Sequence, residues 1–150
     1  MGLGRGGTVK SKTILIAYQD DLWARSLSTF FHGLGYRVEM AQKLSEMNQK
    51  VRSDNIHVIL LDDEIEGVKA YDLVPFLKKT DLRVQVVLIS SEESLSLVRR
   101  LREAGIFYQA MKPVDLDEIR SAVECAFGKI EREKPKKGIF SPLLSKMVPA

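Results

Sequence analysis

The chain has 150 residues, of which 45% are hydrophobic, and this is enough for one domain with a buried core. Its net charge is +3, but the first twelve residues hold +3 and residues 129–150 hold +4, which leaves −4 between them. The basic pI therefore describes the ends of the chain and gives little support to nucleic-acid binding. The one cysteine, Cys125, excludes an internal disulfide framework and a cysteine-rich zinc site, and its apolar helical surroundings predict a place in or near the core.

No apolar run approaches the ~20 residues that span a bilayer, and the N-terminus lacks the apolar centre of a signal peptide. We therefore expect a cytoplasmic protein without a membrane partner. Residues 1–12 are basic and rich in glycine, and this composition predicts a disordered N-terminus.

The first predicted strand, residues 13–17, is a short apolar run. A helix follows it, with Asp20 or Asp21 as its N-terminal cap and glycines at its end. Residues 36–41 alternate between apolar and polar types and predict a second strand. The apolar spacing over residues 44–51 predicts a second, short helix.

The central predicted strand, residues 56–61, is an almost continuous apolar run of the kind that lies in the middle of a parallel sheet. It ends at Asp62. A carboxylate directly after such a strand lies at the carboxyl end of the sheet, where open α/β sheets bind ligands. Asp62 is therefore the first candidate for chemistry, and the alternative is that it only begins a solvated acidic loop.

The third predicted helix contains Pro75, which is tolerated in the first helical turn, so we expect this helix to begin near Asp72. Residues 84–89 form the next apolar strand, and a fourth helix follows and ends at Gly105. The fifth predicted strand covers residues 106–111.

Residues 115–118 resemble a capping box, which opens a fifth helix. Five strands that alternate with five helices predict a doubly wound α/β domain with a parallel sheet, here over residues 13–130. Residues 131–150 are expected to form a charged linker and a short apolar C-terminal segment. In that segment Ser141 and Pro142 could begin a short helix that docks on the domain or on another subunit, and a frayed tail is the alternative.

Six short motifs occur in the order of the predicted elements. They are Ile14-Leu15-Ile16-Ala17, Gly35-Tyr36, Val58-Ile59-Leu60-Leu61-Asp62, Val86-Val87-Leu88-Ile89-Ser90, Glu103-Ala104-Gly105 and Lys112-Pro113. Together they resemble the receiver domain of bacterial two-component response regulators, and the Lys-Pro pair, fifty residues after the aspartate, is the most specific of them. The resemblance implies a flavodoxin-like fold: a five-stranded parallel sheet in the order 2-1-3-4-5, with helices on both faces.

The resemblance also implies roles for three residues. Asp62 matches the aspartate that accepts a phosphoryl group, Ser90 matches the hydroxyl residue that bonds a phosphoryl oxygen, and Lys112 matches the lysine that pairs with the phosphoryl charge. Such a trio is physically reasonable, because an aspartyl phosphate needs stabilisation of its negative charge. Taken singly, Ser90 with Glu93 could be only a helix capping box, and Lys112 could be a surface residue before a turn.

The acidic pair that holds Mg²⁺ in this family is incomplete. Without a gap, its positions fall on Tyr18 and Gln19, and the next residue, Asp20, is acidic. A shift of one residue would place the pair on Gln19 and Asp20, and in either alignment at least one acidic ligand is lost. The metal ligands implied by the resemblance are therefore Asp20, Asp62 and the backbone carbonyl of Glu64. Because Mg²⁺ prefers carboxylate oxygens, we expect at most weak binding of this ion.

Two further departures concern the switch that such domains carry. The aromatic residue expected three positions before the lysine is Gln109, with Tyr108 beside it, which leaves the usual coupling to the hydroxyl residue in question. The loop over residues 63–67 lacks the usual Met-Pro and is acidic, and its charge opposes a further anion at Asp62.

Two functions remain open. The first is a single-domain response regulator in a phosphorelay: it is not an enzyme, takes its phosphoryl group from a histidine kinase or phosphotransfer protein, and signals through protein contacts, with a homodimer among the alternatives. The second is a pseudo-receiver binding module that works without phosphorylation. A flavin-binding oxidoreductase of related topology is disfavoured, because no hydroxyl- and glycine-rich phosphate loop follows the first strand.

Overall fold

The computed structural model describes residues 12–133, and the expectations for residues 1–11 and 134–150 lie outside that range. Five strands form the main sheet, and every neighbouring pair is parallel. They are β1 (Thr13–Ala17), β2 (Arg37–Ala41), β3 (Val58–Leu61), β6 (Gln85–Ser90) and β7 (Tyr108–Met111). Their order is β2-β1-β3-β6-β7. The predicted order 2-1-3-4-5 is confirmed, since β4 and β5 belong to a separate hairpin.

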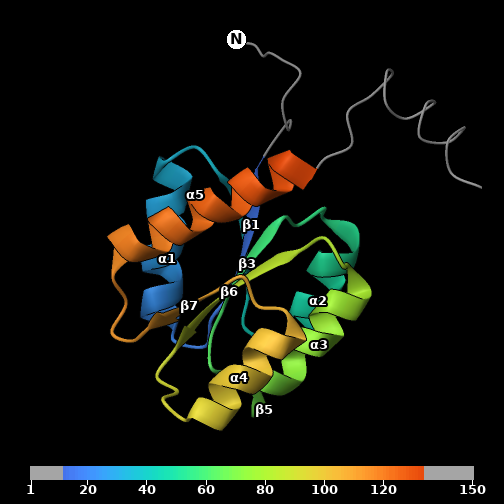
Figure 1. Cartoon of the computed structure of the whole chain (residues 1–150). Helices are drawn as coiled ribbons and strands as arrows, with labels where there is room; N and C mark the ends of the chain where they lie inside the picture. Colours follow the sequence, from blue (N-terminus) through green and yellow to red (C-terminus); the bar gives the residue numbers. More distant parts are fainter. Residues whose placement is uncertain (1–11, 134–150) are drawn as a thin grey trace, which may run out of the picture.

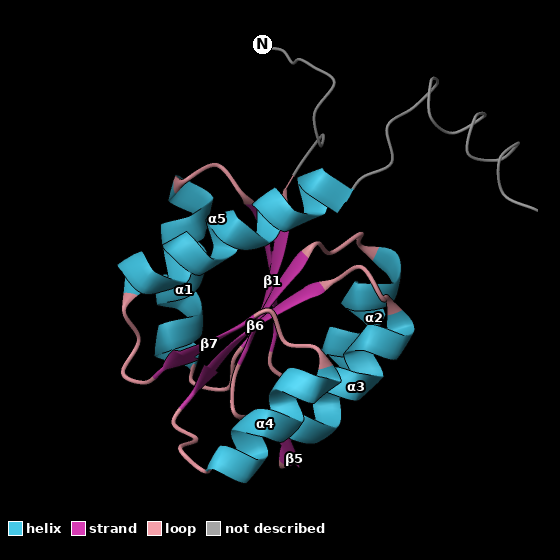
Figure 2. Ribbon diagram, viewed as in Figure 1, coloured by secondary structure: helices cyan, strands magenta, loops and turns pink. Residues whose placement is uncertain are grey.

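Five helices cover the sheet: α1 (Asp21–Gly33), α2 (Leu44–Ser53), α3 (Ala70–Thr80), α4 (Leu95–Ala104) and α5 (Leu116–Glu133). Helices α1 and α5 lie on one face, and α2, α3 and α4 lie on the other (Figures 1 and 2). Among residues 12–133, no helix is long and apolar enough to cross a membrane. Helix α5 runs past the predicted domain boundary at residue 130, as far as Glu133, where the described residues stop.

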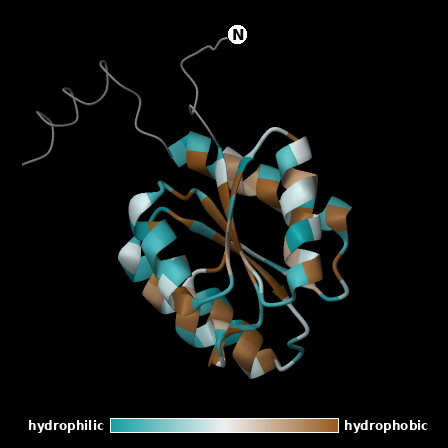
Figure 3. Ribbon diagram, turned by 180° about the vertical axis from the view of Figure 1, so that it is seen from behind, coloured by the Kyte–Doolittle hydropathy of each residue, from teal (hydrophilic) through white to brown (hydrophobic). Residues whose placement is uncertain are grey.

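The central strands supply both halves of the core, because successive side chains of a strand point to opposite faces. In β3, Val58 and Leu60 pack with α1 and α5, whereas Ile59 and Leu61 pack with α2 and α3. All four are fully buried. Figure 3 shows these hydrophobic strands between helices that carry hydrophilic residues on their outer sides.

A two-stranded antiparallel hairpin, β4 (Glu64–Ile65) and β5 (Val68–Lys69), follows Asp62 and was not predicted. Its turn residues, Glu66 and Gly67, have φ angles of 50° and 81°. Positive φ at both central residues is typical of the tight turns that join hairpin strands. The hairpin therefore gives the acidic loop a defined backbone.

Helix α3 begins at Ala70 rather than near Asp72, which makes Pro75 its sixth residue. At that position the proline removes the hydrogen bond to the carbonyl of Tyr71. The helix still includes the earlier turn because the buried face that starts at Ala70 continues through Leu73 and Leu77. Burial of this face outweighs one missing hydrogen bond.

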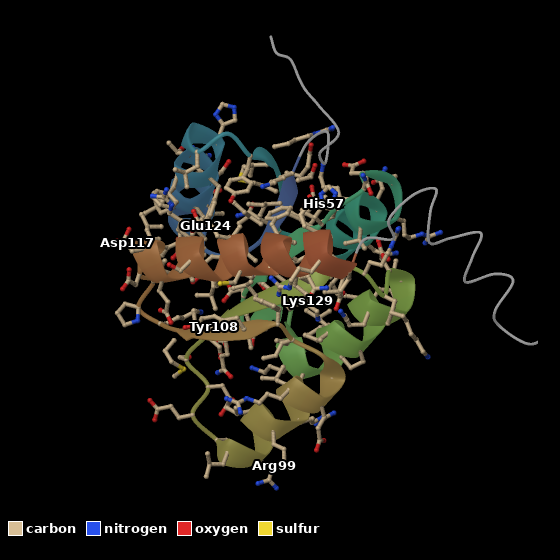
Figure 4. All side chains as sticks on the ribbon, turned by 45° about the horizontal axis from the view of Figure 1, so that its top comes forward. His57, Arg99, Tyr108, Asp117, Glu124 and Lys129 are labelled. Atoms are coloured by element: carbon tan, nitrogen blue, oxygen red, sulfur yellow. The ribbon has the colours of Figure 1, made fainter. Side chains whose placement is uncertain are left out.

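Helix α4 is capped by Ser94, whose Oγ accepts the Leu97 amide at 3.5 Å, and this rules out the alternative that Ser90 and Glu93 form a capping box. The prediction that Cys125 lies in or near the core is wrong. Cys125 is exposed, because the buried side of α5 consists of Ile119, Ala122, Val123, Ala126 and Phe127. Figure 4 shows Asp117, Glu124 and Lys129 along the same helix, and Arg99 on the outer side of α4.

Candidate functional site

The carboxyl ends of β1, β3, β6 and β7 meet at one edge of the sheet, because these strands are parallel and paired in register. The hydrogen bonds between strands continue one residue beyond the ends of β3 and β7. The Asp62 amide donates to the Ala17 carbonyl at 2.9 Å, and the Lys112 amide donates to the Ser90 carbonyl at 2.9 Å. Asp62, Ser90 and Lys112 therefore all lie at this edge.

Asp62 is only 6% exposed, and both of its carboxylate oxygens accept hydrogen bonds. Oδ1 accepts from Nζ of Lys112 at 2.8 Å and from the Asp63 amide at 2.7 Å. Oδ2 accepts from the Gln19 amide at 2.9 Å. A buried polar group needs such partners, and these three contacts hold the carboxylate of Asp62 in one orientation.

Lys112 reaches Asp62 from the end of β7, over the ring of Tyr18, whose centroid is 5.3 Å from Nζ. Burial alone would lower the pKa of Lys112, but the hydrogen bond to Asp62 and the charge of Asp62 raise it above its ordinary value. Lys112 therefore stays cationic at every physiological pH, as a group that neutralises a phosphoryl charge must.

Ser90 is fully buried at the end of β6, and its Oγ accepts the Glu92 amide at 2.8 Å. The next residue, Ser91, was not singled out from the sequence. Its amide and its Oγ each lie 3.1 Å from Oδ2 of Asp63. The loop after β6 thus meets the loop after β3 through a second carboxylate as well as through the predicted trio.

Asp63 is that second carboxylate, and its Oδ2 is also 3.3 Å from Nζ of Lys112. Burial alone would raise the pKa of Asp63. The nearby Ser90 hydroxyl, the hydrogen bond from the Ser91 amide and the charge of Lys112 together outweigh burial and lower this pKa below its ordinary value. The only sequence signal for Asp63 was its charge, because a contact across two loops follows from no periodic pattern.

The side chains near Asp62 fit a Mg²⁺ site poorly. Tyr18 is buried, and burial raises the pKa of its hydroxyl, so a neutral phenol stands at the first position of the acidic pair. The backbone amide of Gln19 donates to Asp62, while the side-chain Oε1 of Gln19 accepts the Glu66 amide. The Asp20 carboxylate caps α1 by accepting the Trp23 amide at 3.1 Å. Within residues 12–133, no three His, Cys, Asp or Glu side chains gather as a metal site would require.

Gln109 on β7, at the position of the family's aromatic residue, and its neighbour Tyr108 each contact another element of the domain. Nε2 of Gln109 donates to the Glu92 carbonyl at 3.3 Å and so joins β7 to the loop after β6. The Tyr108 hydroxyl donates to Glu118 on α5 at 2.7 Å. That hydrogen bond raises the pKa of Tyr108 above its ordinary value.

Comparisons with known proteins agree with this geometry. A sequence model of the response regulator receiver domain matches residues 14–124. Sporulation initiation phosphotransferase F of Bacillus subtilis is 26% identical over 98 residues, which are 65% of this chain and 79% of that protein. The DNA-binding transcriptional regulator NtrC of Azospirillum brasilense is 27% identical over 118 residues, which are 79% of this chain but only 24% of that protein.

Solved structures share the fold. A CheY-like response regulator receiver domain protein from Methanospirillum hungatei superposes with a TM-score of 0.79 at 22% identity, over 83% of this chain and 100% of that one. The family match spans most of the domain, from β1 into α5. The chain belongs to the response regulator receiver domain family.

Proposed function

We propose that this receiver domain accepts a phosphoryl group on Asp62 inefficiently and signals through protein contacts, with a histidine kinase or a phosphotransfer protein as the donor. The observation that carries the proposal is the 2.8 Å contact between Lys112 Nζ and Asp62 Oδ1 at the carboxyl ends of β3 and β7. It places a fixed cation beside a buried carboxylate. The relative from Bacillus subtilis is a phosphotransferase by name, which supports this reaction class.

The proposed step joins an Asp62 oxygen to phosphorus. A new O–P bond forms as the P–N bond of a phosphorylated histidine breaks, and the histidine nitrogen keeps the electron pair and takes up a proton from solvent. Lys112 and the Ser90 hydroxyl stabilise the charge on the transferred group. The domain is a stoichiometric acceptor in this step, and we expect no turnover of a separate substrate.

The expected inefficiency has its cause in the residues beside Asp62. A neutral phenol and a neutral amide occupy the two places where acids hold Mg²⁺ in the family, which leaves Lys112 as the cation in contact with Asp62. Loss of ligands of this kind lowers metal affinity on the order of tenfold or more. We therefore propose weak Mg²⁺ binding through Asp20, Asp62 and the Glu64 carbonyl.

The alternative function is a binding module that works without phosphorylation. The observation in its favour is that the donors at the site already have carboxylate partners, since Lys112 contacts both Asp62 and Asp63. In this case the contacts that join the loops after β3 and β6 are permanent, and a partner recognises the domain as it stands.

The test is the intact mass of the protein after treatment with acetyl phosphate, with and without Mg²⁺. We expect a small phosphorylated fraction from the native chain and none from Asp62→Asn. The double variant Tyr18→Asp with Gln19→Asp should raise both the Mg²⁺ affinity and the phosphorylated fraction, because two carboxylates return to the metal position.

Two outcomes would change this conclusion. Efficient labelling of the native chain at ordinary Mg²⁺ concentrations would show that the incomplete acidic pair does not limit the reaction. If neither the native chain nor the double variant is labelled, the binding module becomes the better description.

A further inference from the structure

Asp63 gathers three hydrogen-bond donors, of which the two from Ser91 have no role in the proposed reaction. All three surround its Oδ2 atom: the Ser91 amide and the Ser91 Oγ, both at 3.1 Å, and Lys112 Nζ at 3.3 Å. Its side chain is 28% exposed, so these contacts are only partly screened by water. A carboxylate with three donors, one of them charged, is a bound anion in its own right.

The backbone also holds Asp63 in this place. Its amide donates to Oδ1 of Asp62 at 2.7 Å, and its carbonyl accepts the Ala70 amide at 2.8 Å, at the start of α3. The hairpin of β4 and β5 lies between these two anchors. The position of the carboxylate therefore depends on the fold of the loop and not on its side-chain contacts alone.

The donors around Asp63 are those that a phosphoryl group on Asp62 would need. Lys112 Nζ is 2.8 Å from Asp62 and 3.3 Å from Asp63, so it bridges the two carboxylates. A phosphoryl group has three free oxygens that require hydrogen-bond donors and positive charge. With Asp63 in place, that group would share one lysine with a carboxylate whose negative charge repels it.

The geometry points to Asp63 as an internal anion that occupies the phosphoryl position: its carboxylate holds the loop after β6 against the loop after β3 without phosphate and obstructs phosphoryl transfer to Asp62. The obstruction to transfer rests on the proposed function. The occupied donors do not, because they are a property of the unmodified chain.

The incomplete acidic pair and Asp63 obstruct the reaction in different ways. The incomplete pair lowers the affinity for Mg²⁺, whereas Asp63 occupies the hydrogen-bond donors of Ser91 and Lys112. Restoration of the acids at residues 18 and 19 should therefore recover only part of the reactivity, and removal of the Asp63 carboxylate should add to it.

The experiment compares phosphorylation rates in the Tyr18→Asp, Gln19→Asp background, with acetyl phosphate and Mg²⁺ at fixed concentrations and intact mass as the readout. Asp63→Ala should be labelled about tenfold faster or more, because a like charge a few ångströms away is lost and three donors become available. Asp63→Asn keeps the shape of the side chain and should show a smaller increase, and it replaces the alanine variant if that one does not fold.

Glu66→Gln is the matched control. Glu66 lies in the same acidic loop, and its carboxylate accepts the Leu44 amide at 2.6 Å rather than any donor at Asp63. The amide side chain keeps that hydrogen bond and removes the same charge. Its labelling rate should stay within about twofold of the parent, as expected for a screened charge that lacks a shared donor.

A second readout does not depend on phosphorylation. Beryllium fluoride is added to the unmodified chain and to Asp63→Ala, and the Ser91 amide is followed by NMR. We expect this resonance to differ between the two proteins before addition, and to respond to the analogue strongly only in Asp63→Ala.

The outcomes separate the two proposals. If the parent double variant is labelled and Asp63→Ala is no faster, the internal anion is refuted and Asp62 remains the acceptor. A second outcome is that no variant is labelled, but the Ser91 amide responds to beryllium fluoride only in Asp63→Ala. This result would support the proposal that Asp63 occupies the donors and would refute Asp62 as the phosphoryl acceptor. A Ser91 resonance that is identical in both unmodified chains would show that the contact is absent in solution and would overturn the inference.

Discussion

His57 lies just before β3, at the end of the sheet opposite Asp62, and its Nδ1 accepts the Thr13 amide at 3.1 Å, as only an unprotonated nitrogen can. Burial lowers the pKa of His57 below its ordinary value. In the unfolded chain this pKa returns to about 6.5, so the unfolded state binds the proton more readily. The folded state should therefore lose stability as the pH falls through about 6.5 towards the lower folded pKa, and the urea midpoint should be lower at pH 5.5 than at pH 7.5.

The variant His57→Gln should make this pH dependence shallower, while carboxylates elsewhere keep part of it. His32→Gln makes the same substitution at an exposed position in the last turn of α1 and serves as the control. An equal slope in the native chain and in His57→Gln would assign the effect to other groups.

At the same scale, the sequence predicted some contacts of the site and not others. The meeting of Asp62 with Lys112 follows from strand order, because each residue directly follows a strand of the sheet and parallel strands end at one edge. The contact of Asp63 with Ser91 could not be predicted in this way. It depends on how two irregular loops place one carboxylate, and no periodicity of the sequence encodes that.

The hairpin after Asp62 depends on the backbone of Gly67, whose φ is 81°. Gly67→Ala places a Cβ in open space but in the left-handed region, so we expect a loss of about 1–2 kcal/mol in the free energy of unfolding. Gly33→Ala is the matched control, because Gly33 ends α1, has open space around it and does not have a positive φ. That variant should be neutral or stabilising by up to about 1 kcal/mol.

Chemical denaturation of the two variants checks this prediction. Equal effects of the same sign would mean that the turn is not held in the left-handed region. A selective loss in Gly67→Ala would also be expected to disturb Asp63, which lies between β3 and the hairpin.

Among the elements, strands and helices were predicted where the apolar pattern is long enough to be unambiguous. β1 matches its prediction residue for residue, and α4 begins and ends where its apolar spacing indicates. The β4–β5 hairpin could not be predicted, because strands of two residues are too short to show an alternation of apolar and polar residues. The start of α3 differs from the prediction because Pro75 costs the helix one hydrogen bond, and burial of the helix face that begins at Ala70 offsets that cost.

The whole molecule consists of two apolar layers that share one sheet. One layer lies between the sheet and α1 with α5, and the other lies between the sheet and α2, α3 and α4. Neighbouring residues of β3 belong to different layers, as Ile59 and Leu60 show. Each central strand contributes side chains to both layers. Loss of packing in one layer therefore removes support from the strands that the other layer packs on, and the domain should unfold as one unit.

The sole tryptophan, Trp23, is 38% exposed on α1, so its fluorescence follows the unfolding of a helix that covers one face of the sheet. A truncation in the layer on the other face tests whether the two layers unfold together. Leu77 on α3 is fully buried in the second layer, so Leu77→Ala should cost about 2–5 kcal/mol. In urea, the midpoint from Trp23 fluorescence should fall by the same amount as the midpoint from far-UV circular dichroism. Leu82→Ala makes the same chemical change at a side chain that is 77% exposed, and by either probe it should change the free energy of unfolding by no more than about 0.5 kcal/mol. A tryptophan transition that stays in place while the dichroism transition shifts or splits would show that the faces of the sheet unfold separately.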